Sequence, residues 1–237
     1  MVDVQDLIGR IGRRRFKRAQ EHAWSTAAGT GESRAGRRPD EWPSDIVYVP
    51  HELRHAIWYE DTHPWRERVE VNLALYRLMP CYSLLPEFWS SYRELDVAAQ
   101  SLLWTEFRSL LSDPDDRLAD PVAYSMWCDF FESADTVSDA WRNLMNPGGL
   151  TDRGLERVLI MSGPVPYAQK SALYERLLPN TRWHYFIFRS LLHSTFDLYG
   201  AVVLDDARRI LDTLELAPDT LHLDVLRQRL EGAAPRS

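Results

Sequence analysis

Cysteine is scarce in this sequence, and long apolar stretches are absent. Only two of the 237 residues are cysteine, and both lie among apolar residues, so we do not expect the disulfide framework of a small secreted protein. An all-cysteine zinc site, which needs four ligands, is excluded. The N-terminus lacks the apolar run and cleavage site of a signal peptide, and no stretch is apolar for long enough to cross a bilayer. We therefore expect a cytoplasmic protein without a transmembrane segment.

Glycine and lysine are also unevenly used. No glycine occurs between residues 37 and 147, and the chain has neither a glycine-rich phosphate loop nor a G-x-S-x-G nucleophile motif. Only Lys17 and Lys170 are lysine among 28 basic residues, a bias typical of a GC-rich genome. These absences remove the common nucleotide-binding and serine-hydrolase signatures from consideration.

What the chain does have is an ordinary globular composition that is rich in aromatic rings. Hydrophobic residues make up 45% and charged residues 27%, with nine Trp, ten Tyr and eight Phe. The net charge is −7, but residues 1–40 carry nine basic against five acidic residues, while the rest carries 19 against 30. The sequence thus describes a basic arm on an acidic body.

The basic arm has the pattern of an amphipathic helix over residues 3–24, with apolar residues on one face. One interpretation is a surface that meets anionic lipid, nucleic acid or an acidic partner. The candidate contacts are Arg13, Arg14, Arg15 and Arg18. The other interpretation is a terminal helix that packs its apolar face on the acidic body.

A stretch of small and polar residues without periodicity, residues 25–44, follows the arm and predicts a flexible linker. We therefore predict two parts. Residues 1–44 form the basic helix and its linker, and residues 45–234 form a single all-helical domain.

From Pro50 onward, amphipathic segments alternate with short breaks, which predicts antiparallel helices. The phrase Phe-Arg-Ser-Leu-Leu occurs twice, at 107–111 and 188–192, each time after an aromatic-rich approach. The spacing of 81 residues resembles two HEAT-type repeat units. The predicted fold is all-α, with helical hairpins stacked as an irregular HEAT-like α-solenoid; an irregular helical bundle is the alternative.

The motif with the clearest chemical meaning is His51-Glu52-Leu53-Arg54-His55. It resembles the H-E-x-x-H motif of zinc-dependent hydrolases, in which two histidines bind zinc and the glutamate acts as general base. Asp61 and His63 are candidates for the third ligand. The alternative is a helix start whose His and Glu side chains make surface hydrogen bonds.

A second polar cluster contains Asp113, Asp115, Asp116 and Asp120. One interpretation is a site for a divalent cation or a basic partner. The other is a helix-capping turn, which is favoured because the cluster lacks the glycine and the terminal glutamate of an EF-hand. Asp120 followed by Pro121 predicts the start of a helix.

We rank a non-enzymatic helical scaffold that binds a protein partner first, because no complete catalytic set is present. A zinc-dependent hydrolase using the motif at 51–55 is the alternative. A peripheral binder of anionic lipid or nucleic acid, acting through the basic helix, is the third possibility. The first hypothesis requires no cofactor, and the second requires zinc.

Overall fold

The computed structural model describes residues 3–27, 42–60, 63–126, 141–145, 149–163, 165–194 and 200–232. Within these ranges all regular secondary structure is helical, which confirms the predicted all-α class. The α-helices are α1 (Val4–Ile11), α2 (Arg13–Ala27), α3 (Val49–Trp58), α4 (Trp65–Leu78), α5 (Pro86–Ser90), α6 (Val97–Leu111), α7 (Asp116–Ser125), α9 (Asp152–Met161), α10 (Tyr167–Leu177), α11 (His184–Leu192), α12 (Gly200–Thr213) and α13 (Leu223–Gly232). Two 3-10 helices, η2 (Tyr82–Leu84) and η4 (Thr181–Trp183), precede α5 and α11.

Side-chain caps explain where several helices begin. Asp3, Asp96 and Thr151 each accept a hydrogen bond from a backbone N–H in the first turn of α1, α6 and α9.

The single amphipathic helix predicted over residues 3–24 is instead two helices. α1 ends at Ile11 and α2 begins at Arg13, with Gly12 between them at a φ of 93°. Glycine tolerates a positive φ because it has no Cβ, so the chain can bend there at little cost.

The predicted helix start at Asp120 and Pro121 is wrong. α7 begins at Asp116, with Asp115 as its N-cap, and Pro121 lies inside the helix. The side chain of Asp115 accepts a hydrogen bond from the backbone N–H of Arg117 at 3.0 Å, and this bond starts the helix one turn earlier.

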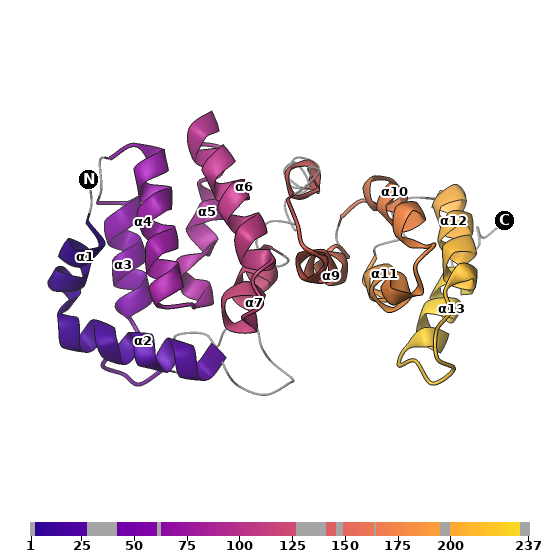
Figure 1. Cartoon of the computed structure of the whole chain (residues 1–237), viewed down its shortest axis with the longest axis horizontal. Coiled ribbons are helices and arrows are strands. Elements are labelled where there is room, and N and C mark those ends of the chain that lie inside the picture. The colour runs from indigo at the N-terminus through magenta and orange to yellow at the C-terminus, as the bar shows by residue number, and fades with distance from the viewer. Residues whose placement is uncertain are drawn as a thin grey trace.

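The helices are laid out along the long axis of the molecule in approximate chain order (Figure 1). α1 to α5 occupy one end, α6 and α7 follow, α9 lies in the middle, and α10 to α13 occupy the other end. α6 contacts α4, α7 and α9, while α9 also contacts α11. Helix α9 therefore connects the two ends of the molecule.

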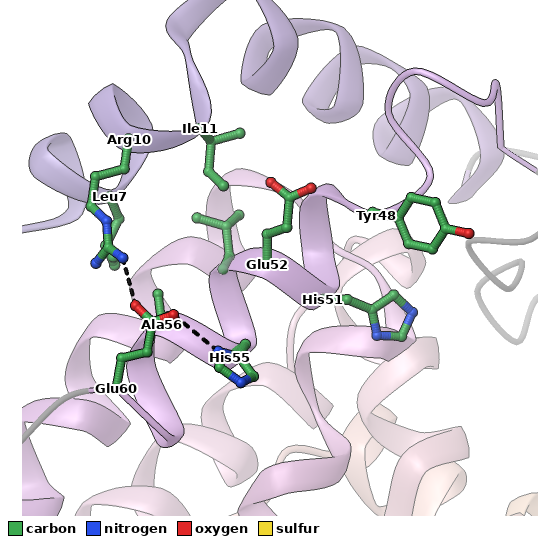
Figure 2. Close-up of a pocket in the computed structure, with 10 residues that line it drawn as sticks. Leu7, Arg10, Ile11, Tyr48, His51, Glu52, His55, Ala56 and Glu60 are labelled. Carbon is green, nitrogen blue, oxygen red and sulfur yellow. Dashed lines mark hydrogen bonds and ion pairs between the residues drawn. The ribbon is translucent and has the colours of Figure 1, made fainter.

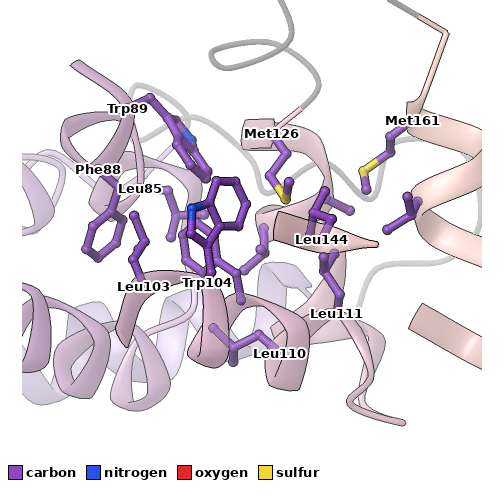
Figure 3. Packing of buried hydrophobic residues seen from close by; sticks show 14 of the residues in the cluster. Leu85, Phe88, Trp89, Leu103, Trp104, Leu110, Leu111, Met126, Leu144 and Met161 are labelled. Carbon is purple, nitrogen blue, oxygen red and sulfur yellow. The ribbon is translucent and has the colours of Figure 1, made fainter. Parts of the chain in front are cut away.

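The two copies of the Phe-Arg-Ser-Leu-Leu phrase lie at the ends of α6 and α11. Phe107 and Phe188 are both fully buried, and both helices contact α9. The Phe107 ring packs 5.4 Å from that of Phe88 and 5.0 Å from that of Trp89, measured between centroids. Figure 3 shows the neighbouring part of the core, where Trp89 and Trp104 lie among leucine and methionine side chains.

The basic arm packs on the rest of the protein. α1 contacts α3 and α4, and α2 contacts α3 and α7. Apolar residues of both helices, including Leu7, Ile8 and Phe16, are buried in the same hydrophobic cluster as the rest of the core. Trp24 donates a hydrogen bond from Nε1 to the carbonyl oxygen of Leu78 at 2.9 Å. The arm therefore uses its apolar face inside the protein, while the division of the chain at residue 44 stays a prediction.

Cys81 lies in the core just before η2, with a free thiol. Burial raises the pKa of this thiol to about 12. Cys128 lies outside the described residues. Among the helices that the structure describes, none is long and apolar enough to cross a lipid bilayer.

Candidate functional site

The His-Glu-Leu-Arg-His motif forms the middle of α3. Leu53 and Ile57, four residues apart on one face of the helix, are buried, while His51, Glu52 and His55 lie on the exposed side (Figure 2). The helical period therefore places these side chains at the surface, and Glu52 points toward α1 and α2 (Figure 2).

The glutamate of this motif is held by an arginine of the basic arm. Arg15 donates two hydrogen bonds to Glu52, from Nη1 to Oε2 at 2.7 Å and from Nη2 to Oε1 at 2.8 Å. Its Nε donates a third bond to the backbone carbonyl of Asp45 at 2.8 Å. The bond to Glu52 raises the pKa of Arg15. The two bonds from Arg15 join α2 to α3 and occupy both carboxylate oxygens of Glu52, the residue predicted as a general base.

The two histidines of the motif have different neighbours. Nη2 of Arg54 lies 3.3 Å from Nδ1 of His51. Burial lowers the pKa of His51, and the positive charge of Arg54 lowers it further. His55 lies with Nδ1 3.1 Å from Oε1 of Glu60, and Oε2 of Glu60 accepts a bond from Arg10 Nη2 at 2.5 Å. The bonds from Arg10 and then His55 hold the pKa of Glu60 below its usual range.

The predicted zinc ligands are His51, His55, Asp61 and His63. Asp61 lies outside the described residues. Among the residues that are described, no group of three or more His, Cys, Asp or Glu side chains is arranged so that it could hold a metal ion.

A hollow of about 530 Å³ lies between α1 and α3 (Figure 2). Its apolar lining comes from Leu7, Ile11, Leu53 and Ala56. The polar lining is formed by Arg10, Tyr48, His51, Glu52, His55 and Glu60. Tyr48 is 63% exposed. The lining therefore combines apolar side chains with charged groups and one aromatic ring.

A second hollow, of about 450 Å³, lies at the start of α2. It is lined by Gly12, Arg13, Arg14, Arg15, Arg18 and Asp45. Arg18 forms an ion pair with Asp45, and Arg15 is bound as described above. Arg13 and Arg14 are exposed and form no ion pair with any residue that the structure describes. Of the four arginines predicted to bind a partner, two are thus engaged within the protein.

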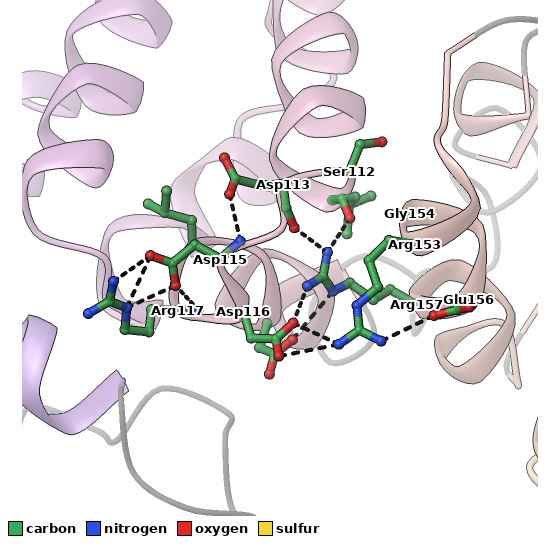
Figure 4. A network of polar contacts seen from close by, with 12 residues as sticks. Ser112, Asp113, Asp115, Asp116, Arg117, Arg153, Gly154, Glu156 and Arg157 are labelled. Carbon is green, nitrogen blue, oxygen red and sulfur yellow. Dashed lines mark hydrogen bonds and ion pairs between the residues drawn. The ribbon is translucent and has the colours of Figure 1, made fainter.

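The acidic cluster after α6 is a capping and ion-pair network (Figure 4). Asp113 accepts a bond from the backbone N–H of Asp115 at 2.8 Å. Partial burial raises the pKa of Asp116, but bonds from Arg153 and Arg157 lower it more, so that it lies below its usual range. These contacts match the helix-capping interpretation.

The feature that sequence reasoning missed is a buried lysine in α10. Lys170 is fully buried, and its Nζ donates hydrogen bonds to the carbonyl oxygens of Ser162 at 2.8 Å and Gly163 at 3.0 Å. A chain of hydroxyl groups lies close by, with Ser190 Oγ 2.6 Å from that of Ser162 and 2.5 Å from the Tyr174 hydroxyl. The sequence did contain a signal, because Lys170 shares the helical spacing of Tyr174 and of other buried residues of α10.

Burial lowers the pKa of Lys170 from 10.5 to about 7. The unfolded chain therefore binds this proton more tightly than the folded chain, and stability should rise with pH above the folded pKa. We expect the free energy of unfolding to increase by about 2 kcal/mol between about pH 7 and about pH 9 because of this group. The measurement is urea denaturation of the wild type and of Lys170→Met at several pH values. Equal pH dependence of the two proteins would contradict the assignment.

The described residues thus form an all-helical protein with two hollows, lined by residues of α1, α2 and α3 and of the segment before α3. Comparison with known protein families, with characterised proteins and with solved structures finds no match to the chain.

Proposed function

We propose that this protein is a non-enzymatic helical scaffold that binds a protein partner, and that the hollow between α1 and α3 is part of the docking surface. The observation that carries the proposal is the composition of this hollow. It combines a partly exposed Ile11 and an exposed Tyr48 with the buried side chains of Leu7, Leu53 and Ala56. Binding at such a surface is favourable when a partner's apolar side chain replaces water there.

The charged groups around this hollow also favour binding over catalysis. Arg10 pairs with Glu60, and Arg15 pairs with Glu52. A general base needs a free oxygen that can accept a proton from substrate or water, whereas both oxygens of Glu52 accept bonds from Arg15. Paired charges at the edge of an apolar patch instead contribute to the specificity of a protein interface.

A HEAT-like stacking of the helical hairpins is part of the proposal. It is supported by the layout of the helices in approximate chain order along the long axis (Figure 1). It is also supported by the contacts of α6 and α11, which carry the two copies of the same phrase, with α9. Stacked hairpins of this kind present an extended surface to partners.

The proposal can be tested by placing a photo-reactive amino acid at Tyr48 of the full-length protein in the cells that naturally make it. We expect a discrete covalent adduct with another protein after irradiation. Ala56→Arg fills the apolar hollow and should reduce the adduct at least about tenfold, because burying an unpaired charge in the contact costs more than about 1.4 kcal/mol.

The control for the added charge is Ala172→Arg, which introduces the same side chain at an exposed alanine in the middle of α10, whereas Ala56 is buried. This variant should keep the adduct. Ala56→Gln fills the same space without adding a charge. Circular dichroism of each variant shows whether it is folded, so that loss of binding can be distinguished from loss of folding. Adducts that are absent in the wild type, or that persist in both Ala56 variants, would overturn the proposal.

A further inference from the structure

The two hollows described above are neighbours. Ile11 lines the hollow between α1 and α3, and the next residue, Gly12, lines the hollow at the start of α2. The ion pair between Arg15 and Glu52 separates them, because Glu52 lines the first hollow and Arg15 the second. One short segment of a partner can therefore contact both.

The second hollow has an excess of positive charge. Its lining contains four arginines and one acidic residue, Asp45. Asp45 pairs with Arg18, and Glu52 pairs with Arg15, which leaves Arg13 and Arg14 without an acidic partner among the described residues. The first turn of α2 contains no acidic residue.

The position of Arg13 and Arg14 at the start of α2 also favours a negatively charged partner. Positive side chains in the first turn of a helix face the positive end of the helix dipole, which is unfavourable for each charge. A carboxylate brought in by a partner would relieve this repulsion. The arrangement is thus complementary to negative charge beside an apolar contact.

We infer that the partner is a protein segment in which an apolar side chain is flanked by acidic residues. The apolar side chain occupies the hollow between α1 and α3, and the carboxylates contact Arg13 and Arg14. This inference rests on the proposed function and adds the chemistry of the partner to it.

A protein segment fits these observations better than a membrane or a nucleic acid. A basic helix binds a bilayer by inserting its apolar face, but Ile8 and Phe16 are buried inside this protein. Nucleic acid would meet an acidic body, since the chain beyond residue 40 carries 19 basic against 30 acidic residues.

The experiment is a selection of random displayed peptides on the full-length protein, with Ala56→Arg used to remove peptides that bind elsewhere. We expect the selected peptides to carry an apolar residue beside an excess of Asp and Glu. A synthetic selected peptide, labelled with a fluorophore, should then bind Arg13→Glu and Arg14→Glu each about fivefold more weakly than the wild type. Added salt should reduce these differences.

Arg176→Glu is the matched control. Arg176 lies on an exposed position of α10 and forms no ion pair with any described residue, so its reversal should change the affinity less than twofold. Vesicles of phosphatidylserine and phosphatidylcholine and a DNA duplex are tested in parallel.

The outcomes separate the two claims. Peptides that require Ala56 but lack acidic residues, or that bind Arg13→Glu and Arg14→Glu like the wild type, overturn the inference and leave the proposed function intact. Selection of no peptide that requires Ala56 counts against both. Binding of vesicles or DNA that is lost in Arg13→Glu, without peptide binding, also overturns the inference.

Discussion

Replacement of Phe107 or Phe188 by alanine is expected to lower the free energy of unfolding by about 4 kcal/mol in each case. Both rings are fully buried, in α6 and α11, and each lies in a helix that contacts α9. Removing a ring deletes its dispersion contacts and leaves a cavity that the packed neighbours can fill only in part. Urea denaturation followed by circular dichroism gives the change directly.

The matched control is Val97→Ala, at the exposed start of α6, where 83% of the residue's surface is accessible. We expect this change to stay within about 0.5 kcal/mol of the wild type. If Phe188→Ala were equally mild, the second copy of the phrase would not be a core element.

Arg157→Met should lower the free energy of unfolding by about 3 kcal/mol. Arg157 is only 6% exposed and donates hydrogen bonds from Nη1 to the carbonyl oxygens of Leu111 at 2.6 Å and Asp113 at 2.8 Å. It also pairs with Asp116 (Figure 4). Methionine has a similar length but no donor, so the two carbonyl groups at the end of α6 lose these partners.

Arg153→Met is the control for this experiment, because Arg153 contacts the same carboxylate from a position that is 50% exposed. An exposed ion pair contributes little, so the expected loss is below about 1 kcal/mol. Equal effects of the two substitutions would show that burial of Arg157 does not determine its contribution.

The amphipathic segments could be predicted from the sequence because they depend on residues close together in the chain, but of two local start signals before α7 the sequence did not show that Asp115, and not Asp120, is the cap. The helix ending at Leu111 and the cap at Thr151 follow from periodicity and from hydrogen bonds within one turn. The burial of Phe107 and Phe188 is consistent with the aromatic-rich sequence before each of the two phrases.

What the sequence could not show depends on contacts between distant residues. Arg15 and Glu52 are 37 positions apart, so nothing in the local pattern indicated that the motif's glutamate is engaged by the basic arm. The helical spacing placed Lys170 with the buried residues of α10, but a lysine at such a position can also reach solvent, so its burial depends on how α10 packs against its neighbours. The break at Gly12 had a local signal, since glycine permits a positive φ, but glycine is also tolerated inside helices.

The thiol of Cys81 has a further consequence for how this protein responds to oxidants. Because its pKa is about 12, almost none of it is ionised at neutral pH, and its sulfur is enclosed by the core. Oxidants and alkylating reagents therefore reach this sulfur only when the surrounding helices separate. Chemical damage at this position is governed by how often the molecule opens, so any change that loosens the helical packing also exposes the chain to irreversible modification.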